Sequence, residues 1–170
     1  MKRLFLATVL FSLAILSGGN MQGQEVTEIA SYQDFLNISD NATGNYKQTA
    51  DIEFPNNTFP AKSFAGTYDG QGFSIKSSGN QNKTLFNEIS DGEVKNLVID
   101  GVTISIDATS STSIGGLCSN QSGGLIYGIT VKNCNFTKHG AASEEKLCGG
   151  VVGKMTDGKI SNCNVSNTYI

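Results

Sequence analysis

The stretch Gly92-Glu-Val-Lys-Asn-Leu-Val-Ile-Asp-Gly-Val-Thr-Ile104 decides the fold, because versions of it return at residues 124–136 and 158–170. The full repeating units, which align without internal gaps, are residues 85–104, 117–136 and 151–170. Six aligned columns are apolar in all three units, and a seventh is always glycine. Since 38% of the residues are apolar, chance would make only about one column in twenty apolar throughout.

The spacing of the apolar residues shows which kind of repeat this is. In the first unit they stand two or three residues apart, between polar neighbours, at Val94, Leu97, Ile99, Val102 and Ile104. This is strand spacing, whereas a helical repeat of similar length would place apolar residues at intervals of three and four over ten or more residues. One such unit cannot bury its apolar row alone, so equivalent strands of successive units must stack. The sequence therefore predicts an all-β fold, a parallel β-helix (β-solenoid).

The chain begins with a segment typical of export. Lys2 and Arg3 precede an apolar run at residues 4–16, and small residues follow it. The run is too short to cross a bilayer, which needs about 20 residues, and no cysteine stands where a lipoprotein would carry its lipid. We predict a cleaved signal peptide at residues 1–23, no transmembrane segment, and a secreted or cell-surface protein.

A short helix is predicted after this segment. Ser31-Tyr-Gln-Asp34 has the form of a capping box ahead of an apolar run, which predicts a helix at about residues 31–38. We assign residues 24–45 to an N-terminal cap region, because a helix there would cover the otherwise open first coil. Residues 46–170 are assigned to the parallel β-helix, with its first strand expected at residues 49–54.

The densest turn signal, Phe64-Ala-Gly-Thr-Tyr-Asp-Gly-Gln-Gly-Phe-Ser-Ile75, is followed by Leu85-Phe-Asn87 and by two glycine-rich elements. Those elements are Gly115-Gly-Leu-Cys-Ser119 and Gly149-Gly-Val-Val-Gly153. In this order the segments resemble bacterial secreted proteins that carry GLUG motifs, although Ser119 replaces the closing glycine of the first element. The resemblance implies a right-handed parallel β-helix on a secreted or surface protein, and it implies no shared chemistry.

Composition narrows the class of partner. Beyond residue 23 the chain has 15 acidic residues, 10 lysines and no arginine, which gives a net charge of −5 (10 − 15). Binding to phosphate groups needs a basic face, so we expect no nucleic-acid partner. The expected partner is a glycan or a cell-surface protein.

The last unit ends at Ile170 as regularly as the units before it, with no polar segment that resembles a cap. Two explanations are open: the chain continues beyond Ile170, or another subunit or a further domain covers this end. We favour a chain that continues, and we leave the oligomeric state open.

Four cysteines in an exported chain raise the question of disulfides. Aligned on the repeat, they fall in four different columns, so the repeat alone brings no pair to bridging distance: Cys118, Cys134, Cys148 and Cys163. We interpret them as small core side chains, and a disulfide between columns stays open. Together with the single histidine, they make a poor zinc site.

Four aspartates are candidates for the paired carboxylate chemistry that cleaves glycans: Asp69, Asp91, Asp100 and Asp107. We interpret them as turn and surface residues, because two precede turn glycines and Asp100 takes an outward strand position. Residues 144–146 (Glu-Glu-Lys), with His139, are interpreted as a solvated insertion between units. We therefore assign no catalytic, cofactor-binding or metal-binding residue, and we expect no cofactor.

Glycan binding is harder to set aside, since Tyr68, Tyr127 and Tyr169 are candidates to face outward and stack on sugars. Asparagines 96, 133, 162 and 167 are interpreted as turn or ladder residues. Our leading hypothesis is a non-enzymatic β-helix module of a bacterial extracellular protein, adhesin-like or a structural shaft, within a longer chain. The alternatives are a polysaccharide-acting β-helix enzyme, or a fragment of one, and a non-catalytic glycan-binding module.

Overall fold

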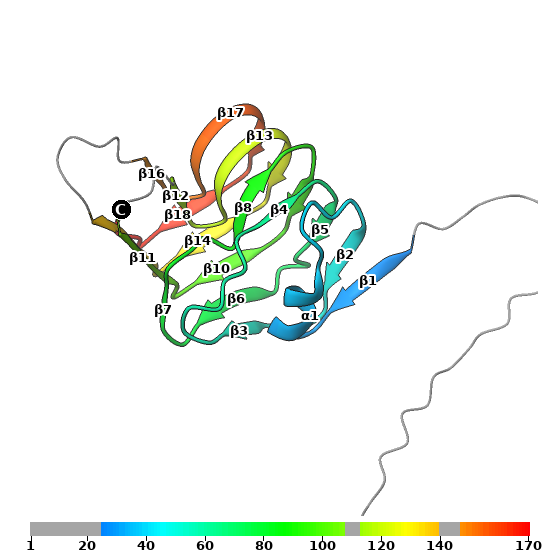
Figure 1. Ribbon diagram of the computed structural model, residues 1–170, viewed down its shortest axis with the longest axis horizontal. Helices are drawn as coiled ribbons and strands as arrows, with labels where there is room; N and C mark the ends of the chain where they lie inside the picture. The colour runs from blue at the N-terminus through cyan, green and yellow to red at the C-terminus, as the bar shows by residue number, and fades with distance from the viewer. Residues whose placement is uncertain (1–24, 108–112, 140–146) are drawn as a thin grey trace, which may run out of the picture.

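A computed structural model describes residues 25–107, 113–139 and 147–170 (Figure 1). This part of the chain is rich in β-strand, and all of its strand pairs are parallel. It contains one short helix, α1 (Tyr32–Asn37). The expected signal peptide, residues 1–23, lies outside the described residues.

The described strands form four sheets, and the largest sheet is curled because some of its own strands are strongly bent (Figure 1). That sheet contains β1 (Val26–Ile29), β2 (Asn45–Gln48), β4 (Lys62–Phe64), β5 (Thr67–Asp69), β8 (Phe86–Ile89), β9 (Glu93–Lys95), β13 (Cys118–Tyr127) and β17 (Val152–Ser161). The second contains β3 (Ile52–Phe54), β6 (Ser74–Ser77), β10 (Val98–Asp100), β14 (Thr130–Lys132) and β18 (Asn164–Ser166). The two smaller sheets contain β7 (Asn80–Gln81), β11 (Thr103–Asp107) and β15 (Asn135–His139), and β12 (Ile114–Gly115) with β16 (Cys148–Gly149).

Strand pairing follows the predicted repeat. Ile99 pairs with Val131, 32 residues later (131 − 99), and Val131 pairs with Val165, 34 residues later (165 − 131). In the curled sheet, Ile126 likewise pairs with Val94 on one side and with Ile160 on the other. The predicted all-β, parallel class and the register of the three units are thereby confirmed.

The same stacking continues further towards the N-terminus than the sequence repeat indicates. Tyr46 pairs with Tyr68, and Tyr68 pairs with Val94, so β2 and β5 precede the first repeating unit in the same sheet. β1 pairs with β2 in turn. The expected first strand, at residues 49–54, was therefore placed too late, and β1 lies inside the range assigned to the cap region, residues 24–45.

One column of glycines runs through this stacking. The three glycines of the repeat are preceded in register by two more, which gives Gly44, Gly66, Gly92, Gly124 and Gly158. A Cβ atom on Gly124 would lie 2.1 Å from the carbonyl oxygen of Gly92, and one on Gly66 would lie 2.2 Å from that of Gly44. At Gly66, Gly92, Gly124 and Gly158 a backbone atom of a neighbouring segment lies within 2.9 Å of where a Cβ would stand, which explains why glycine recurs in the three units of the repeat.

The core lies between the sheets and is built from inward columns of like side chains. Ile52, Ile75, Ile99 and Val131 form one such column, and each is at most 1% exposed. Tyr68 occupies another inward column and is fully buried, where its hydroxyl donates to Oε1 of Gln48 at 3.0 Å. The prediction that Tyr68 faces outward was therefore wrong, because a buried partner satisfies its hydroxyl.

The predicted N-terminal helix is confirmed and has a polar cap. Ser31 is its N-cap residue, and the Ser31 hydroxyl accepts a hydrogen bond from the Asp34 backbone N–H at 3.2 Å. The Ser31 hydroxyl donates to the Asp34 carboxylate at 2.8 Å, and the Ala30 N–H donates to it at 3.1 Å. These bonds hold the pKa of Asp34 below its usual value, chiefly through Ser31.

The apolar side of α1 covers the N-terminal end of the core. Phe35 is fully buried, with its ring 5.5 Å from that of Phe54 and 5.4 Å from that of Tyr68. Close by, at the C-terminal end of the helix, the ammonium group of Lys62 donates to the backbone carbonyls of Leu36 and Ile38. The C-terminal part of the helix is thus fixed to the sheets.

Candidate functional site

The last repeating unit leaves one edge of the described structure unpaired. β17 pairs with β13 and β18 pairs with β14, and no other described strand pairs with either (Figure 1). Backbone N–H and C=O groups on the free side of such strands are ready to bond another strand. We call β17, β18 and residues 167–170 the C-terminal edge.

Side chains of this edge expose positions that are buried in the units before it. Ile126 is fully buried, whereas its successor Ile160 is 37% exposed. Val131 is fully buried, whereas its successor Val165 is 41% exposed. Among the described residues, the apolar columns of the core therefore become partly exposed at this edge.

Exposed large apolar side chains gather at this edge. Six occur among the described residues, and five belong to the last unit: Met155, Ile160, Val165, Tyr169 and Ile170. Tyr169 and Ile170 also line a hollow of about 480 Å³ together with Phe136 and Cys148. Single apolar side chains on a protein surface are normal, and of these five only Tyr169 and Ile170 line the same hollow.

Two outward columns of the sheets carry charges that alternate in sign along the stack. The first reads Glu28, Lys47, Asp69, Lys95, Tyr127 and Ser161. The second reads Glu53, Lys76, Asp100, Lys132 and Ser166, with Asp100 one residue beyond the pair formed by Ile99 and Ile75. Opposite charges on neighbouring strands stabilise their pairing modestly, and like charges would oppose it.

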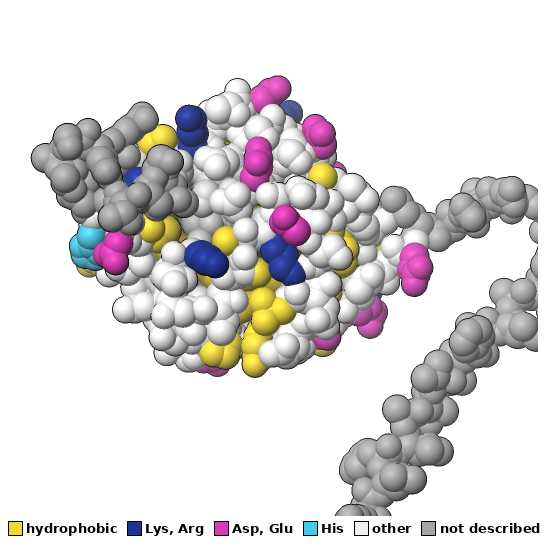
Figure 2. All heavy atoms as spheres, in the orientation of Figure 1, with side chains coloured by type: hydrophobic (Ala, Val, Ile, Leu, Met, Phe, Trp, Pro, Cys, Tyr) yellow, Lys and Arg dark blue, Asp and Glu magenta, His cyan; other side chains and the backbone are white. Residues whose placement is uncertain are grey.

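The charge columns end differently at the two ends of the stack. At the N-terminal end both begin with a glutamate, whereas at the C-terminal edge both end in an uncharged serine, Ser161 or Ser166. Figure 2 shows acidic and basic side chains scattered over a mostly uncharged face, without a field of one sign. The two charge columns therefore end in uncharged residues at the C-terminal edge, although β17 carries exposed Lys154, Asp157 and Lys159 elsewhere along its length.

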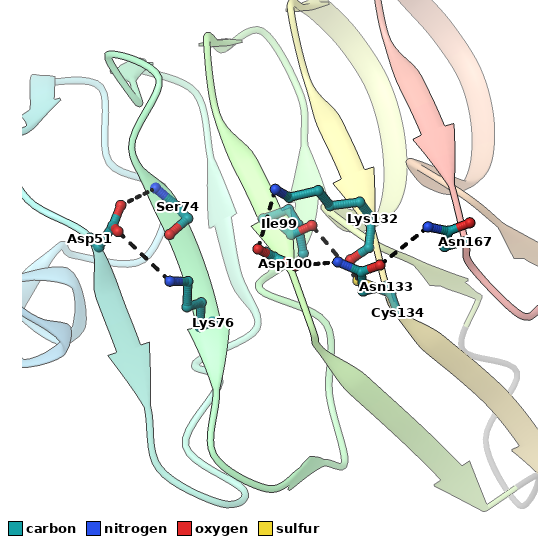
Figure 3. A network of polar contacts seen from close by, with 9 residues as sticks. All are labelled: Asp51, Ser74, Lys76, Ile99, Asp100, Lys132, Asn133, Cys134 and Asn167. Atoms are coloured by element: carbon teal, nitrogen blue, oxygen red, sulfur yellow. Dashed lines mark hydrogen bonds and ion pairs between the residues drawn. The ribbon is translucent and has the colours of Figure 1, made fainter.

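The second charge column is seen from close by in Figure 3. The ammonium group of Lys132 lies 3.4 Å from the Asp100 carboxylate, and that of Lys76 lies 3.8 Å from the Asp51 carboxylate. The Ser74 backbone N–H donates to Asp51 at 2.8 Å, and this bond is the main reason that the pKa of Asp51 lies below its usual value.

Asparagines 96, 133, 162 and 167 all take the left-handed backbone conformation, with φ between 48° and 55°. Asn133 donates to the Asp100 carboxylate at 2.9 Å, and Asn167 donates to Oδ1 of Asn133 at 3.5 Å (Figure 3). Asparagine tolerates this conformation better than most residues, which suits it to the sharp turns between sheets. The prediction that these are turn or ladder residues is confirmed.

The candidate aspartates are not brought together. Asp69 accepts hydrogen bonds from the Gln71 N–H at 3.0 Å and from the Asn96 side chain at 3.1 Å, which is a turn role. Asp100 lies in a different sheet, and Asp91 and Asp107 are exposed. His139 is exposed beside the Ser105 hydroxyl at 3.2 Å, and residues 144–146 lie outside the described residues. Across the described part of the chain, no group of three or more His, Cys, Asp or Glu residues is placed to hold a metal ion.

All four cysteines are described and all are free thiols. Cys118 and Cys134 are buried, and burial raises the pKa of both thiols, which keeps them protonated and unreactive. Cys148 and Cys163 are half-buried and pack against the core. This agrees with the interpretation of the cysteines as core side chains.

The two remaining candidate tyrosines differ in their surroundings. Tyr127 is half-exposed in the first charge column, with the Lys95 ammonium group 5.8 Å from its ring centre. Tyr169 is 77% exposed at the C-terminal edge. The tyrosines therefore do not form one sugar-binding surface, and Tyr169 belongs to the exposed apolar group.

Comparisons with models of known protein families, with curated proteins and with solved structures found no match to this chain. In the described ranges, no helix has the length and apolar character that crossing a bilayer requires. The function is therefore inferred from the geometry of the chain itself.

Proposed function

We propose that residues 46–170 form a right-handed parallel β-helix of the kind found in bacterial secreted proteins that carry GLUG motifs. The support is the register of the parallel strands, in which equivalent residues of successive units meet in three or more columns. Right-handedness follows from the general rule that crossovers between parallel strands are right-handed in about 98% of cases. The glycine-rich elements at residues 115–119 and 149–153 support the resemblance.

The function proposed for this module is that of an extracellular, surface-exposed shaft or adhesin-like segment without enzymatic activity. The observation that carries it is the continuous ladder of backbone bonds between units, reinforced on the outside by charges of alternating sign. A ladder of this kind makes a stiff body whose length depends on the number of units. The segment at residues 1–23, which is typical of export, supports a location outside the cell.

Two measurements test this proposal, one on intact host cells and one on the protein purified after export. Protease treatment of intact host cells should remove the protein, or the protein should be found in the medium. Incubation with neutral and acidic polysaccharides should release no more reducing ends or unsaturated sugars than a heat-unfolded sample does. An intracellular location would contradict the proposal, and so would sustained turnover, which would favour the polysaccharide-acting enzyme instead.

A non-catalytic glycan-binding module is the second candidate, and one surface favours it. A hollow of about 280 Å³ lies on the outer face of the curled sheet. It is lined by the ring of Tyr46, by Val26 and by six polar or charged residues: Asn45, Lys47, Thr67, Asp69, Gln71 and Lys95. Sugars bind to aromatic faces rimmed by hydrogen-bonding groups. This candidate predicts binding on a glycan array that Asn45→Ala and Lys47→Ala weaken, with Lys154→Ala, remote from the hollow, as control.

A further inference from the structure

We infer that a hollow beside β8 binds one sugar unit that carries a carboxylate, as the units of acidic polysaccharides do. The hollow measures about 280 Å³ and lies where the segment between β7 and β8 meets the end of β11 and the start of β13. Pockets for drug-sized ligands measure about 300–1,000 Å³, so this hollow suits a single sugar unit. It shares no lining residue with the hollow beside Tyr46, so the inference does not rest on the functions proposed above.

Two buried hydroxyl groups line this hollow, and their own hydrogen bonds orient them. Thr84 and Ser119 are each 1% exposed. The Thr84 hydroxyl donates to the carbonyl oxygen of Phe86 at 2.7 Å and lies 2.8 Å from the Ser119 hydroxyl. Because the single hydrogen of the Thr84 hydroxyl is used on the carbonyl, Ser119 must donate to Thr84. The Ser119 oxygen therefore keeps lone pairs that can accept a hydrogen bond from a sugar hydroxyl.

Ser119 is also the position at which the first glycine-rich element lacks its closing glycine. One residue beyond Cys118 and its partners in the neighbouring units, the column reads Asn87, Ser119 and Gly153. A Cβ atom on Gly153 would lie 2.7 Å from the backbone nitrogen of Ile114, so that position has no room for a side chain. Asn87 and Ser119 do carry side chains, and both line the hollow. The glycine of this column is thus replaced where a polar group can face a ligand.

The remaining polar groups of the hollow suit a sugar acid. The side chains of Asn82 and Asn87 have no hydrogen-bond partner among the described residues, and each can both donate and accept. Lys83 is the only charged residue that lines the hollow. Within the described ranges it forms no ion pair, whereas four other lysines lie beside a carboxylate. An ammonium group without such a partner favours a ligand that brings a carboxylate of its own.

The apolar wall of the hollow contains a residue with a strained backbone. Ala61 and Ile106 form this wall, and Ala61 has a φ of +50°. The other non-glycine residues with positive φ in the described part of the chain are asparagines and Gln71. Alanine is strained in this conformation, and such strain persists where another requirement outweighs it. A longer side chain at this position would narrow the hollow, so the small alanine keeps it open.

Nuclear magnetic resonance of the isotope-labelled protein, purified after export, tests the inference with galacturonic acid and its methyl ester as matched probes. At neutral pH the side-chain amide signals of Asn82 and Asn87 should shift saturably with the acid. The uncharged ester should bind about twofold to fivefold more weakly, which is the range that exposed ion pairs give. Shifts confined to the side-chain amide of Asn45 would place the sugar in the hollow beside Tyr46. That result would overturn the inference and would leave the glycan-binding candidate intact.

Substitutions separate the charge from the space. Lys83→Gln should remove the preference for the acid over the ester, whereas Lys159→Gln, an exposed position on β17, should keep it. Ala61→Asn should weaken the binding of both probes by about tenfold or more while the protein stays folded, because asparagine tolerates positive φ but narrows the hollow. Ala61→Gly, which leaves the hollow open, should keep binding. The absence of saturable shifts at Asn82 and Asn87, equal affinity for acid and ester, or full binding by Ala61→Asn would each overturn the inference.

Discussion

The two ends of the stack are built from the same kind of strand and are finished in opposite ways. At the N-terminal end, α1 lays Phe35 over the core, Lys62 holds the last carbonyls of the helix, and acidic residues begin both outward columns. At the C-terminal edge, Ile160 and Val165 expose the core columns, and both outward columns end in serine. A helix thus covers the core at the N-terminal end, whereas the core columns are exposed at the C-terminal edge among the described residues.

The difference between the two ends of the stack shows that the repeat and the ends have different structural roles. The repeat sets the register and the thickness of each layer, because its glycines and apolar residues meet their equivalents in neighbouring units. At the N-terminal end, α1 and the Lys62 side chain, which are not part of the repeat pattern, cover the core instead of another unit.

The largest expected effect compares the same substitution at the two ends. Phe35→Ala should lower the free energy of unfolding by about 3–5 kcal/mol, because it leaves an enclosed cavity beneath α1. Phe136→Ala should cost less, because Phe136 already borders the hollow at the C-terminal edge and solvent can fill the space. Urea unfolding measures both, with exposed Gln33→Ala as control. Equal losses of unfolding free energy for Phe35→Ala and Phe136→Ala would contradict the difference described between the two ends.

The turn asparagines give the next largest effect. Asn133→Ala should lower the free energy of unfolding by about 1–2 kcal/mol, because alanine is strained at φ +55°. Asn133→Gly should cost less, since glycine adopts this conformation freely. Asn167→Ala, at φ +48° on the C-terminal edge, should cost less than Asn133→Ala because its unit is bonded on one side. Urea unfolding of the three variants checks this order, and a larger loss for Asn167→Ala would contradict it.

The cap of α1 gives a smaller effect that depends on pH. Ser31→Ala should lower the free energy of unfolding by about 1 kcal/mol at pH 6. The Asp34 pKa is lowered in the folded protein, so the stability it contributes is present above the pKa of the unfolded chain. That contribution is lost as pH falls through the lower, folded value. The difference in free energy of unfolding between wild type and Ser31→Ala should therefore become smaller as the pH falls. Urea unfolding at a series of acidic pH values measures this difference. A difference that does not change with pH would rule out this role for Asp34.

The smallest effect concerns the alternating charges. Lys132→Glu should lower the free energy of unfolding by less than about 1 kcal/mol, because it sets a second carboxylate beside Asp100 at a partly exposed site. The loss should shrink in high salt, which screens exposed charges. Lys154→Glu is the control, because Lys154 pairs with the uncharged Asn120. Thermal unfolding at low and high salt measures both variants, and equal shifts would show that alternation has no stabilising role.

Much of the fold was open to prediction from the sequence because three units keep nearly the same length. The columns of Ile99 and Val94 could be read directly, and the capping box at Ser31 predicted α1. The earlier strands β1, β2 and β5 escaped, because the turns between them are shorter and the spacing falls to 22 residues between Tyr46 and Tyr68 (68 − 46). For β2 and β5, the signal that could have found them is the glycine that directly precedes each strand, Gly44 and Gly66.

Less of the candidate site could be predicted. The repeat predicted which columns are apolar, and the structure shows which of their members are exposed in the last unit, such as Ile160 and Val165. Tyr68 was misjudged because a polar ring in an inward column needs a buried partner, and Gln48 could be identified as that partner only from the pairing of β2 with β5. The alternation of charge was hidden for the same reason, since it appears only when units of unequal length are set in register.

The alternation of charge also bears on how such a chain can lengthen during evolution. Duplicating a single unit would set a residue such as Lys47 or Asp69 beside its own copy, so like charges would meet along the outward column. Duplicating two consecutive units would keep every positive residue beside a negative one. Genes for stacks of this design should therefore grow and shrink by pairs of units, and odd changes in length should be accompanied by a charge reversal.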